Sequence, residues 1–454
     1  MCKLAIKIIG SMIASLAIII LIFIVLKSVH STWFQTKPQF HILSTTNQNQ
    51  THSILSEPRV REGIAHCIDR GSLIKVTYPW LRDRSFLQMK SVLPQQHWAF
   101  MPANEGVEAI SFDPAKGEAL FEAAGWVLGS EDNIRTNAYG REMRLTLTGG
   151  TSDFQRKLLA ALADQLKSCG LQIEIKSIPI EVLYGNNSGL RVRDFELSVY
   201  PIQIEPGLDW LASMTTCDHI PQVDNHWQGE NYGGWCNPVI YNAIDMAREQ
   251  PSQETQVAAY RVISAAMAQD LPGLPLFRSV EVFVTHPLLS HFAPDPGEHF
   301  FTWNIGEWVI PGKDTIVIGR AAEPVNLYPL NEGAEEDLVR SLVFGQDYIT
   351  RGYEYQPHLL KAVPSIENGL VQVNTVQAHT GDQVVDTNGN SVDLQPGVWV
   401  RNKDGKTILF DGHPVELNQF VVTYEFVQGL VWSDGTPVSR ADYEFGFPDA
   451  LQAR

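Results

Sequence analysis

The stretch Arg144–Ile175, RLTLTGGTSDFQRKLLAALADQLKSCGLQIEI, decides the fold class of this chain. Apolar and polar side chains alternate over Arg144–Thr148 and again over Leu171–Ile175, as is typical of strands with one buried face. Between them, Phe154–Lys167 has apolar residues at helical spacing and ends just before Gly170. A strand, a helix and a strand at this spacing predict a βαβ unit with a parallel strand pair. We therefore expect an α/β fold.

Segments of the same character surround this unit. Apolar residues at helical spacing predict three further helices, and a fourth is expected before Phe344. The three are Val60–Ile68, Ala119–Ala124 and Gln253–Gln269. Short alternating runs predict four further strands at Phe195–Tyr200, Val280–Thr285, Thr315–Gly319 and Thr423–Phe426. Beyond residue 369, several Asn-Gly and Asp-Gly turns make the chain rich in predicted β-hairpins.

Length and charge exclude some classes of protein. A chain of 454 residues is long enough for two or three domains. Its formal charge of -17 and pI near 5.2 argue against a nucleic-acid surface, which requires basic patches. We expect an acidic globular body and no nucleic-acid partner.

The N-terminus carries a targeting signal. Lys3 and Lys7 precede an unbroken apolar stretch, Ile8–Leu26, which is about long enough to cross the roughly 30 Å hydrocarbon layer as a helix. Val29–Ser31 offers small residues in a cleavable arrangement, so a removed signal peptide and a retained membrane anchor stay open. Both place the rest of the chain outside the cytoplasm. Residues 36–52 are polar with little periodicity and are interpreted as a linker.

Five cysteines are too few for a disulfide scaffold. In an exported chain, Cys217 and Cys236 lie close enough along the sequence to pair, and they are the disulfide candidate. Cys67 lies among apolar residues of an expected helix and Cys169 at the end of another. Both are interpreted as buried thiols.

Histidines near the expected disulfide raise a second possibility. Cys217, His219, His226 and Cys236 are the residue types of a zinc site, but their spacing fits no compact ligand pattern. The disulfide is the favoured interpretation. We therefore expect no metal and no cofactor.

Several blocks resemble the large substrate-binding proteins of peptide-type ABC importers, the class with oligopeptide-, dipeptide- and nickel-binding members. Five blocks between residues 59 and 277 are similar to the second half of that family and stand in the family's order. They are Arg59–Arg70, Phe112–Trp126, Lys167–Leu171, Asn231–Pro238 and Leu271–Phe277.

A second group of blocks resembles the beginning of the same family, although it lies later in this chain. It comprises Ile316–Gly319 with Glu323–Pro324, Leu327–Leu330, Val363–Gly369 and Trp432–Pro437. The two halves therefore stand in exchanged order, and the family's block between residues like Phe445 and Arg59 has no counterpart here. Circular permutation with a deletion, a fragment of a tandem pair and a truncated reading frame all fit this pattern.

The resemblance implies a two-lobed periplasmic-binding-protein-like α/β fold of class II, the large peptide-binding type, in permuted or partial form. The expected organisation follows from the matched blocks. It is a signal peptide or membrane anchor over 1–37, a linker over 38–58, an α/β far lobe over 59–275, a return segment of the near lobe over 276–311, and a β-rich, truncated near-lobe segment over 312–454.

In peptide-binding relatives, an acidic residue just after the strand similar to Phe195–Tyr200 holds the ligand's amino terminus, because a buried ammonium needs a paired carboxylate. Here the first acid after that strand is Glu205, so Glu205 could hold the ligand's amino terminus only if the strand register differs from that of the relatives. The expected ligand-binding residues are Tyr200, Glu205, Trp210, Asn231 and Trp235, with Trp227 as a further pocket aromatic. Each of them is also compatible with a purely structural role.

The resemblance implies an extracytoplasmic solute-binding component of an ABC importer, at the outer face of the bacterial cytoplasmic membrane or in the periplasm. Its expected partners are a peptide or other small solute, the permease subunits, and the membrane through the N-terminal helix. A degenerate homologue without transport activity, acting as a membrane-tethered interaction protein, is the alternative. An enzyme is not expected, because no catalytic motif is present; a metal held by Cys217 and Cys236 would revive that possibility.

Overall fold

A computed structural model describes residues 32–35, 39–44, 54–101, 110–130, 132–295, 301–320, 323–324, 334–387 and 389–442. The apolar stretch Ile8–Leu26, the block Leu327–Leu330 and Phe445 lie outside the described residues. Among the residues that are described, no helix is long and apolar enough to cross a membrane.

The chain divides into two compact units. Unit 1 comprises residues 1–236 and 264–355, and unit 2 comprises residues 237–263 and 356–454. The expected far lobe, 59–275, therefore loses its helical segment 237–263 to the unit that contains the C-terminal strands. The units are described separately below.

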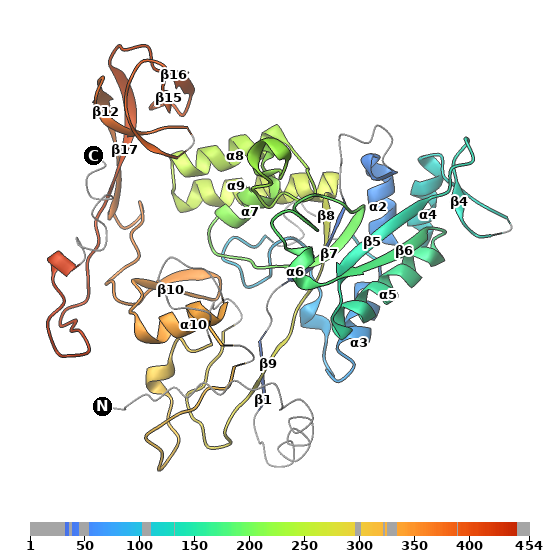
Figure 1. The fold of residues 1–454 in the computed structure, drawn as a ribbon, viewed down its shortest axis with the longest axis horizontal. Coiled ribbons are helices and arrows are strands. Elements are labelled where there is room, and N and C mark those ends of the chain that lie inside the picture. The colour runs from blue at the N-terminus through green and yellow to red at the C-terminus, as the bar shows by residue number, and fades with distance from the viewer. Residues whose placement is uncertain are drawn as a thin grey trace. The chain divides into compact units, whose positions relative to one another are not determined.

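A five-stranded mixed sheet forms the centre of unit 1, in the order β6-β5-β7-β2-β8. Figure 1 shows this sheet with helix α5 packed along β5 and β6. Its strands are β2 (Gln39–Ser44), β5 (Arg144–Gly150), β6 (Gln172–Ile178), β7 (Leu197–Ile202) and β8 (Gly273–Arg278).

The expected βαβ unit is confirmed. β5 and β6 run parallel in a register that pairs Leu145 with Ile173, and α5 (Asp153–Ser168) connects them. Ser152 begins this helix by accepting a hydrogen bond from the Gln155 N–H at 3.2 Å. Gly170, with φ of +88°, follows its end in the left-handed conformation that glycine adopts at little cost.

Three more helices cover the same part of unit 1: α2 (Pro58–His66), α3 (Arg70–Thr77) and α4 (Pro114–Ala123). Asp69 and Asp113 cap α3 and α4, and Pro58 and Pro114 occupy first-turn positions where a missing N–H costs nothing. Apolar side chains from these helices, from α5 and from the sheet form one continuous core.

A disulfide crosses this core between Cys67 and Cys169, whose Cα atoms are 6.3 Å apart. The expectation of two separate buried thiols was wrong. The two cysteines are 102 residues apart in sequence, so only the packing of α2 against the end of α5 brings them together. The linker expected over 38–58 also needs correction, because β2 lies inside it as an interior strand of the sheet.

Strand β2 is six residues long and flanked by polar segments, which hid it in the sequence. It is antiparallel to β7 on one side and to β8 on the other, so its backbone is hydrogen-bonded along both edges. Just outside the sheet, β1 (Thr32–Gln35) pairs with β9 (Glu281–Val284). The chain segment β1–β2 therefore runs antiparallel beside the segment β8–β9, both within the sheet and just outside it.

The remaining elements of unit 1 are short. Residues 315–319, an expected strand, form none, because no described strand pairs with them and Val317 is 65% exposed. β10 pairs with β11, and the division between the two units falls inside β11, between Tyr355 and Gln356. These elements are β3 (Val127–Leu128), β4 (Arg135–Thr136), α6 (Ile180–Leu183), α7 (Asp209–Thr215), α10 (Ala334–Val343), β10 (Tyr348–Arg351) and β11 (Glu354–Pro357), with 3-10 turns at Ile54–Ser56, Ser85–Leu87, Cys217–His219, Val223–Asn225 and Ile305–Glu307.

Unit 2 combines α8 (Pro238–Glu249) and the first part of α9 (Gln253–Asp270) with three antiparallel strand pairs. Its small core contains Val400, Phe410 and Leu417. Arg401 lies 3.0 Å from Asp245 and 3.4 Å from Glu249 of α8, which ties the helix to the strands. The strands are β12 (Val371–Ala378), β13 (Gln383–Val385), β14 (Ser391–Asp393), β15 (Trp399–Arg401), β16 (Thr407–Leu409) and β17 (Val415–Val422).

The expected hairpins of this region are present, but one strand is displaced. Instead of Thr423–Phe426, the strand is β17, which ends at Val422 and pairs with β12 along eight residues. Leu417 of β17 is buried in the small core, and this burial fixes the position of the ladder. Beyond it, Phe426 forms an isolated bridge to Leu360.

Candidate functional site

The carboxyl end of β7 is where the sequence placed a ligand site. Tyr200, near that end, is 3% exposed, and its ring meets Tyr232 edge-on at 5.7 Å. Burial, with Tyr232, Tyr184 and Glu230 nearby, raises the pKa of Tyr200 well above its ordinary value. Its hydroxyl has no hydrogen-bond partner among the described residues. It is therefore a neutral phenol with a free polar atom facing other tyrosines.

The segment after β7 is held by two aromatic residues from a distant loop. The His97 Nε2 lies 3.1 Å from the carbonyl oxygen of Glu205, and the Trp98 indole N–H donates to the carbonyl of Pro206 at 3.0 Å. The two rings stack with centroids 5.8 Å apart. The backbone around Glu205 is thus fixed by side chains more than 100 residues away in sequence.

His97 is locked as one neutral tautomer. Its Nδ1 accepts a hydrogen bond from the Ala99 N–H at 3.1 Å, so its proton lies on Nε2, which donates to the Glu205 carbonyl. Burial lowers the pKa of His97 to about 4. A proton on Nδ1 would also replace the hydrogen bond from the Ala99 N–H with a repulsion between two donors. The contact that positions Glu205 therefore needs neutral His97.

Three carboxylates gather beyond the end of β7: Glu205, Asp209 of α7, and Glu230. Desolvation raises the pKa of Glu205, and the negative charges of Asp209 and Glu230 raise it further. No Lys, Arg or His in the described part of the chain forms an ion pair with Glu205. The Tyr355 hydroxyl is close to the same group, because burial and then Glu205 raise the pKa of Tyr355. The site is a negatively charged patch bordered by phenols, which favours a cation.

A long loop, residues 217–236, provides Glu230 and Tyr232. A disulfide between Cys217 and Cys236, with Cα atoms 5.0 Å apart, closes it at its base. Arg193 supports it from outside by donating from Nε to the Tyr232 carbonyl at 3.1 Å. At Gly234, φ is +67° and a β-carbon would overlap the Arg193 guanidinium, so only glycine fits.

Asn231 and Trp235 have structural contacts inside this loop. The Asn231 amide nitrogen donates to the carbonyls of Thr216 at 2.9 Å and Trp235 at 2.7 Å, and its side chain is buried. The Trp235 indole N–H donates to the Asp270 carboxylate at 2.9 Å. The Asn231 side chain therefore ties the two ends of the loop together, the Trp235 side chain ties the loop to the end of α9, and neither has a free donor to offer a ligand.

The other two predicted aromatics lie at the edges of the site. Trp210, in the first turn of α7, is buried, and its indole N–H has no partner among the described residues. Trp227 is partly buried, has a φ of +61°, and accepts a hydrogen bond from Arg191 Nη1 at its carbonyl. Trp210 keeps a polar group that a ligand could satisfy; Trp227 mainly shapes the loop.

The zinc alternative loses its thiolates, because Cys217 and Cys236 are joined to each other. His219 Nδ1 lies 2.7 Å from the Thr216 hydroxyl instead. Within the described ranges, no group of three or more His, Cys, Asp and Glu side chains could hold a metal ion.

Comparison with known proteins agrees with this architecture. The family model described as bacterial extracellular solute-binding proteins, family 5 (middle) matches residues 27–210. The oligopeptide-binding protein AppA of Bacillus subtilis, solved with a nonapeptide, superposes with a TM-score of 0.51 at 15% identity, over 62% of this chain and 52% of that one. The oligopeptide-binding protein of Thermus thermophilus, solved with a pentapeptide, gives 0.51 at 21% identity, over 59% and 46%. No curated protein sequence matches the chain.

The fold is similar to that of these two solved oligopeptide-binding proteins. This confirms the expected mixed α/β fold class, and the chain spans about half the length of the two solved structures. Sequence reasoning considered Asp209 only as a more distant acid and missed the other groups of the candidate site. They are Tyr184, Tyr232, Tyr355 and Glu230, together with His97. The match to the family's loop 231–238 was the signal that pointed nearest to them.

Proposed function

We propose that this protein is the extracytoplasmic solute-binding component of an ABC importer, that it binds peptides or similar solutes by lobe closure, and that it delivers them to permease subunits. Support comes from the family model over residues 27–210 and from the shared fold of two oligopeptide-binding proteins. Such a protein needs no catalytic group, because it works by enclosing its ligand.

An extracytoplasmic location is supported by the cysteines. The pairs Cys67–Cys169 and Cys217–Cys236 are disulfides, which persist in oxidising compartments and are rare in the cytosol of ordinary bacteria. The apolar stretch Ile8–Leu26 would export the chain or tether it to the outer face of the cytoplasmic membrane.

The observation that carries the ligand assignment is the acidic patch at the end of β7. Burial raises the pKa of Glu205, and the nearby charges of Asp209 and Glu230 raise it further. A ligand ammonium bound among them would relieve the repulsion between these charges and form charge-assisted hydrogen bonds with the carboxylates. The buried hydroxyl of Tyr200 and the indole N–H of Trp210 offer uncommitted polar atoms beside them. The proposed solute therefore presents a cationic group, such as a peptide amino terminus.

A binding panel tests this proposal. The full chain is titrated with short peptides of varied charge, monitored by tryptophan fluorescence and thermal shift. Glu205→Gln removes one charge of the patch with little change in shape and should weaken binding of cationic peptides about tenfold, equivalent to ~1.4 kcal/mol. Glu174→Gln, an exposed carboxylate on β6, is the matched control and should leave binding unchanged. Failure of every peptide to bind would refute the proposed function.

A degenerate homologue that no longer transports, and acts as a membrane-tethered interaction protein, is the second candidate. It is favoured by the intramolecular hydrogen bonds that occupy the side-chain donors of Asn231 and Trp235. The protein would then unfold cooperatively but give no ligand-dependent shift with any peptide or metal chelate in the panel.

We also propose that the two halves of the family stand in exchanged order in this chain, with the block at Trp432–Pro437 equivalent to the family's beginning. That block forms a turn in which Gly435 has φ of +89°, as an Asp-Gly turn requires. Sequencing the DNA on both sides of this reading frame tests the idea. A neighbouring frame that encodes the absent block would make the chain one piece of a split pair, whereas flanking DNA without such a block would leave a permutation with a deletion.

A further inference from the structure

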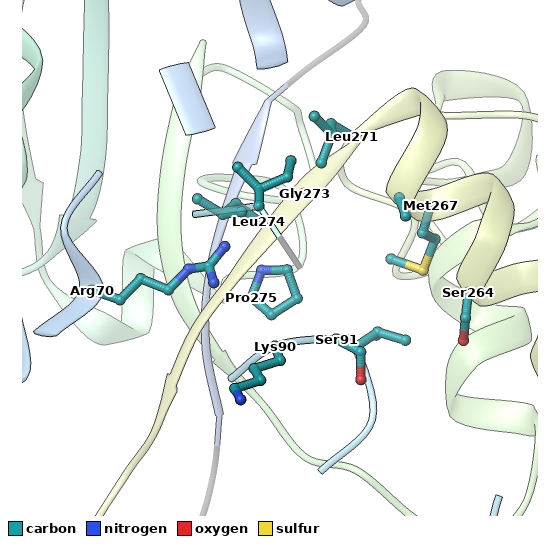
Figure 2. Close-up of a pocket in the computed structure, with 12 residues that line it drawn as sticks. Arg70, Lys90, Ser91, Ser264, Met267, Leu271, Gly273, Leu274 and Pro275 are labelled. Atoms are coloured by element: carbon teal, nitrogen blue, oxygen red, sulfur yellow. The ribbon is translucent and has the colours of Figure 1, made fainter. Parts of the chain in front are cut away.

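A buried arginine lines a small pocket beside the sheet of unit 1. Arg70, in the first turn of α3, is 5% exposed, and Figure 2 shows its side chain reaching toward Leu274 and Pro275 of β8. The pocket has a volume of about 40 Å³. Its other walls include Met267 from α9 and the segment that carries Lys90.

The guanidinium of Arg70 is poorly satisfied. Within the described residues it makes one hydrogen bond, from Nη1 to the Met89 carbonyl at 3.0 Å, and its buried Nε has no partner. Arg61, a buried arginine of the same unit, is better satisfied, because it donates to the carbonyls of Leu55, Ser56 and Asp270. The buried Nη2 of Arg135 has no hydrogen-bond partner among the described residues either, but it lies 3.7 Å from the Glu118 carboxylate. Arg70 therefore combines an unpartnered donor with the lack of a facing carboxylate among the described residues.

The charge of Arg70 is also uncompensated. No carboxylate of the described residues pairs with it, and burial alone lowers its pKa to about 10. A second positive charge, Lys90, lines the same pocket. A buried charge without a counter-ion is costly, so an anion in the pocket would stabilise the folded chain.

We propose that this pocket binds a small monovalent anion, best matched by a formate-sized carboxylate, with the Nε edge of the Arg70 guanidinium as its main ligand. A planar carboxylate fits the two-pronged edge of a guanidinium. A volume of about 40 Å³ holds roughly three water-sized atoms, which admits formate and excludes a bulky acid. Lys90 adds a longer-range attraction. The residues of this site are different from those of the acidic patch, so the inference stands apart from the proposed function.

The test uses thermal unfolding of the full chain in low-chloride buffer. Sodium formate is compared with sodium pivalate, which carries the same carboxylate on a group too large for the pocket, at equal ionic strength. Formate at 100 times its Kd should raise the folding equilibrium constant about 100-fold, because it binds only the folded chain. Pivalate should have no specific effect. A direct Kd comes from the line width of ¹³C-formate in NMR spectra.

Two variants locate the binding. Arg70→Met keeps the length of the side chain and should abolish the formate response. Lys90→Gln, at an exposed position that tolerates substitution, should weaken formate binding about threefold while the chain stays folded. Glu174→Gln should bind formate as the parent does. Equal responses to formate and pivalate would overturn the assignment. A full formate response in folded Arg70→Met, or an unchanged formate Kd in Lys90→Gln, would overturn it as well.

Discussion

The disulfide between Cys67 and Cys169 makes a prediction about stability. Replacing both residues by alanine removes a cross-link between α2 and the end of α5 without leaving a buried polar group. The bridge closes a loop of 102 residues, and the loop-entropy relation assigns about 4.7 kcal/mol to such a loop as an upper value. Measured losses are commonly lower, so we expect about 4 kcal/mol.

The second disulfide is an internal comparison. Cys217–Cys236 closes a loop of only 19 residues, for which the same relation gives about 3 kcal/mol. The double alanine variant of the longer loop should therefore lose about 1.5 kcal/mol more than that of the shorter one. In this relation the difference comes from loop length, and any overestimate that applies equally to both loops cancels in it.

Urea unfolding of the parent and both double variants, followed by tryptophan fluorescence and circular dichroism, measures these losses. A thiol titration of the parent chain in denaturant provides the independent check. Two disulfides among five cysteines leave Cys2 as the one reactive thiol, and a removed signal peptide would leave none. The reasoning is refuted by a count of three or more thiols in protein from an oxidising compartment, or by a Cys67→Ala/Cys169→Ala variant as stable as the parent.

Three further predictions concern single side chains. Burial lowers the pKa of His97 from 6.5 to about 4, so its stabilising contribution is complete above pH 6.5 and is lost as the pH falls toward 4. The loss amounts to about 3 kcal/mol in the free energy of unfolding. In His97→Gln, the free energy of unfolding should depend less steeply on pH over this range. Asn231→Ala leaves two backbone carbonyls without donors and should lower the free energy of unfolding in urea by ~2–3 kcal/mol. The control Asn237→Ala removes only a helix cap and should cost ~1 kcal/mol. Equal losses in the two variants would contradict the cross-linking role of Asn231. Arg401→Ala should lower the thermal midpoint of unit 2 by a few degrees at most, because the ion pairs of this partly exposed side chain contribute about 1 kcal/mol. A larger drop would mean that the Arg401 side chain also contributes by packing.

Local patterns predicted a large part of the fold. The βαβ unit, the helices at Pro58–His66 and Gln253–Asp270 and the turns of the C-terminal region follow from periodicity, capping residues and Asn-Gly or Asp-Gly pairs. These signals are local because the hydrogen bonds of a helix or a tight turn lie within a few residues. Elements stabilised within their own segment were therefore found at nearly the right positions.

Elements that depend on distant partners were missed. Strand β2 has only six residues and exists because β7 and β8 pair with both of its edges. The Cys67–Cys169 bridge and the contact of His97 with Glu205 each join residues more than 100 positions apart. Nothing in one sequence marks such pairs.

The candidate site shows the same division. Tyr200 lies in a strand that the sequence predicts and Glu205 follows that strand, so local pattern was enough to select both, and their role in binding stays a prediction. Glu230 and Tyr232 could not be connected to them, since a loop closed by Cys217 and Cys236 brings them there. Asn231 and Trp235 carried the residue types of a binding loop, but their donors stabilise the loop itself.

The central claim, that the acidic patch at the end of β7 receives the cationic group of a solute, has one most direct test. Isothermal titration calorimetry compares a peptide that binds in the panel with its N-acetylated counterpart, which differs only in lacking the amino-terminal charge. We predict that the free peptide binds at least tenfold more tightly to the parent chain, a difference of ~1.4 kcal/mol or more. Equal affinity for the two peptides would contradict the claim.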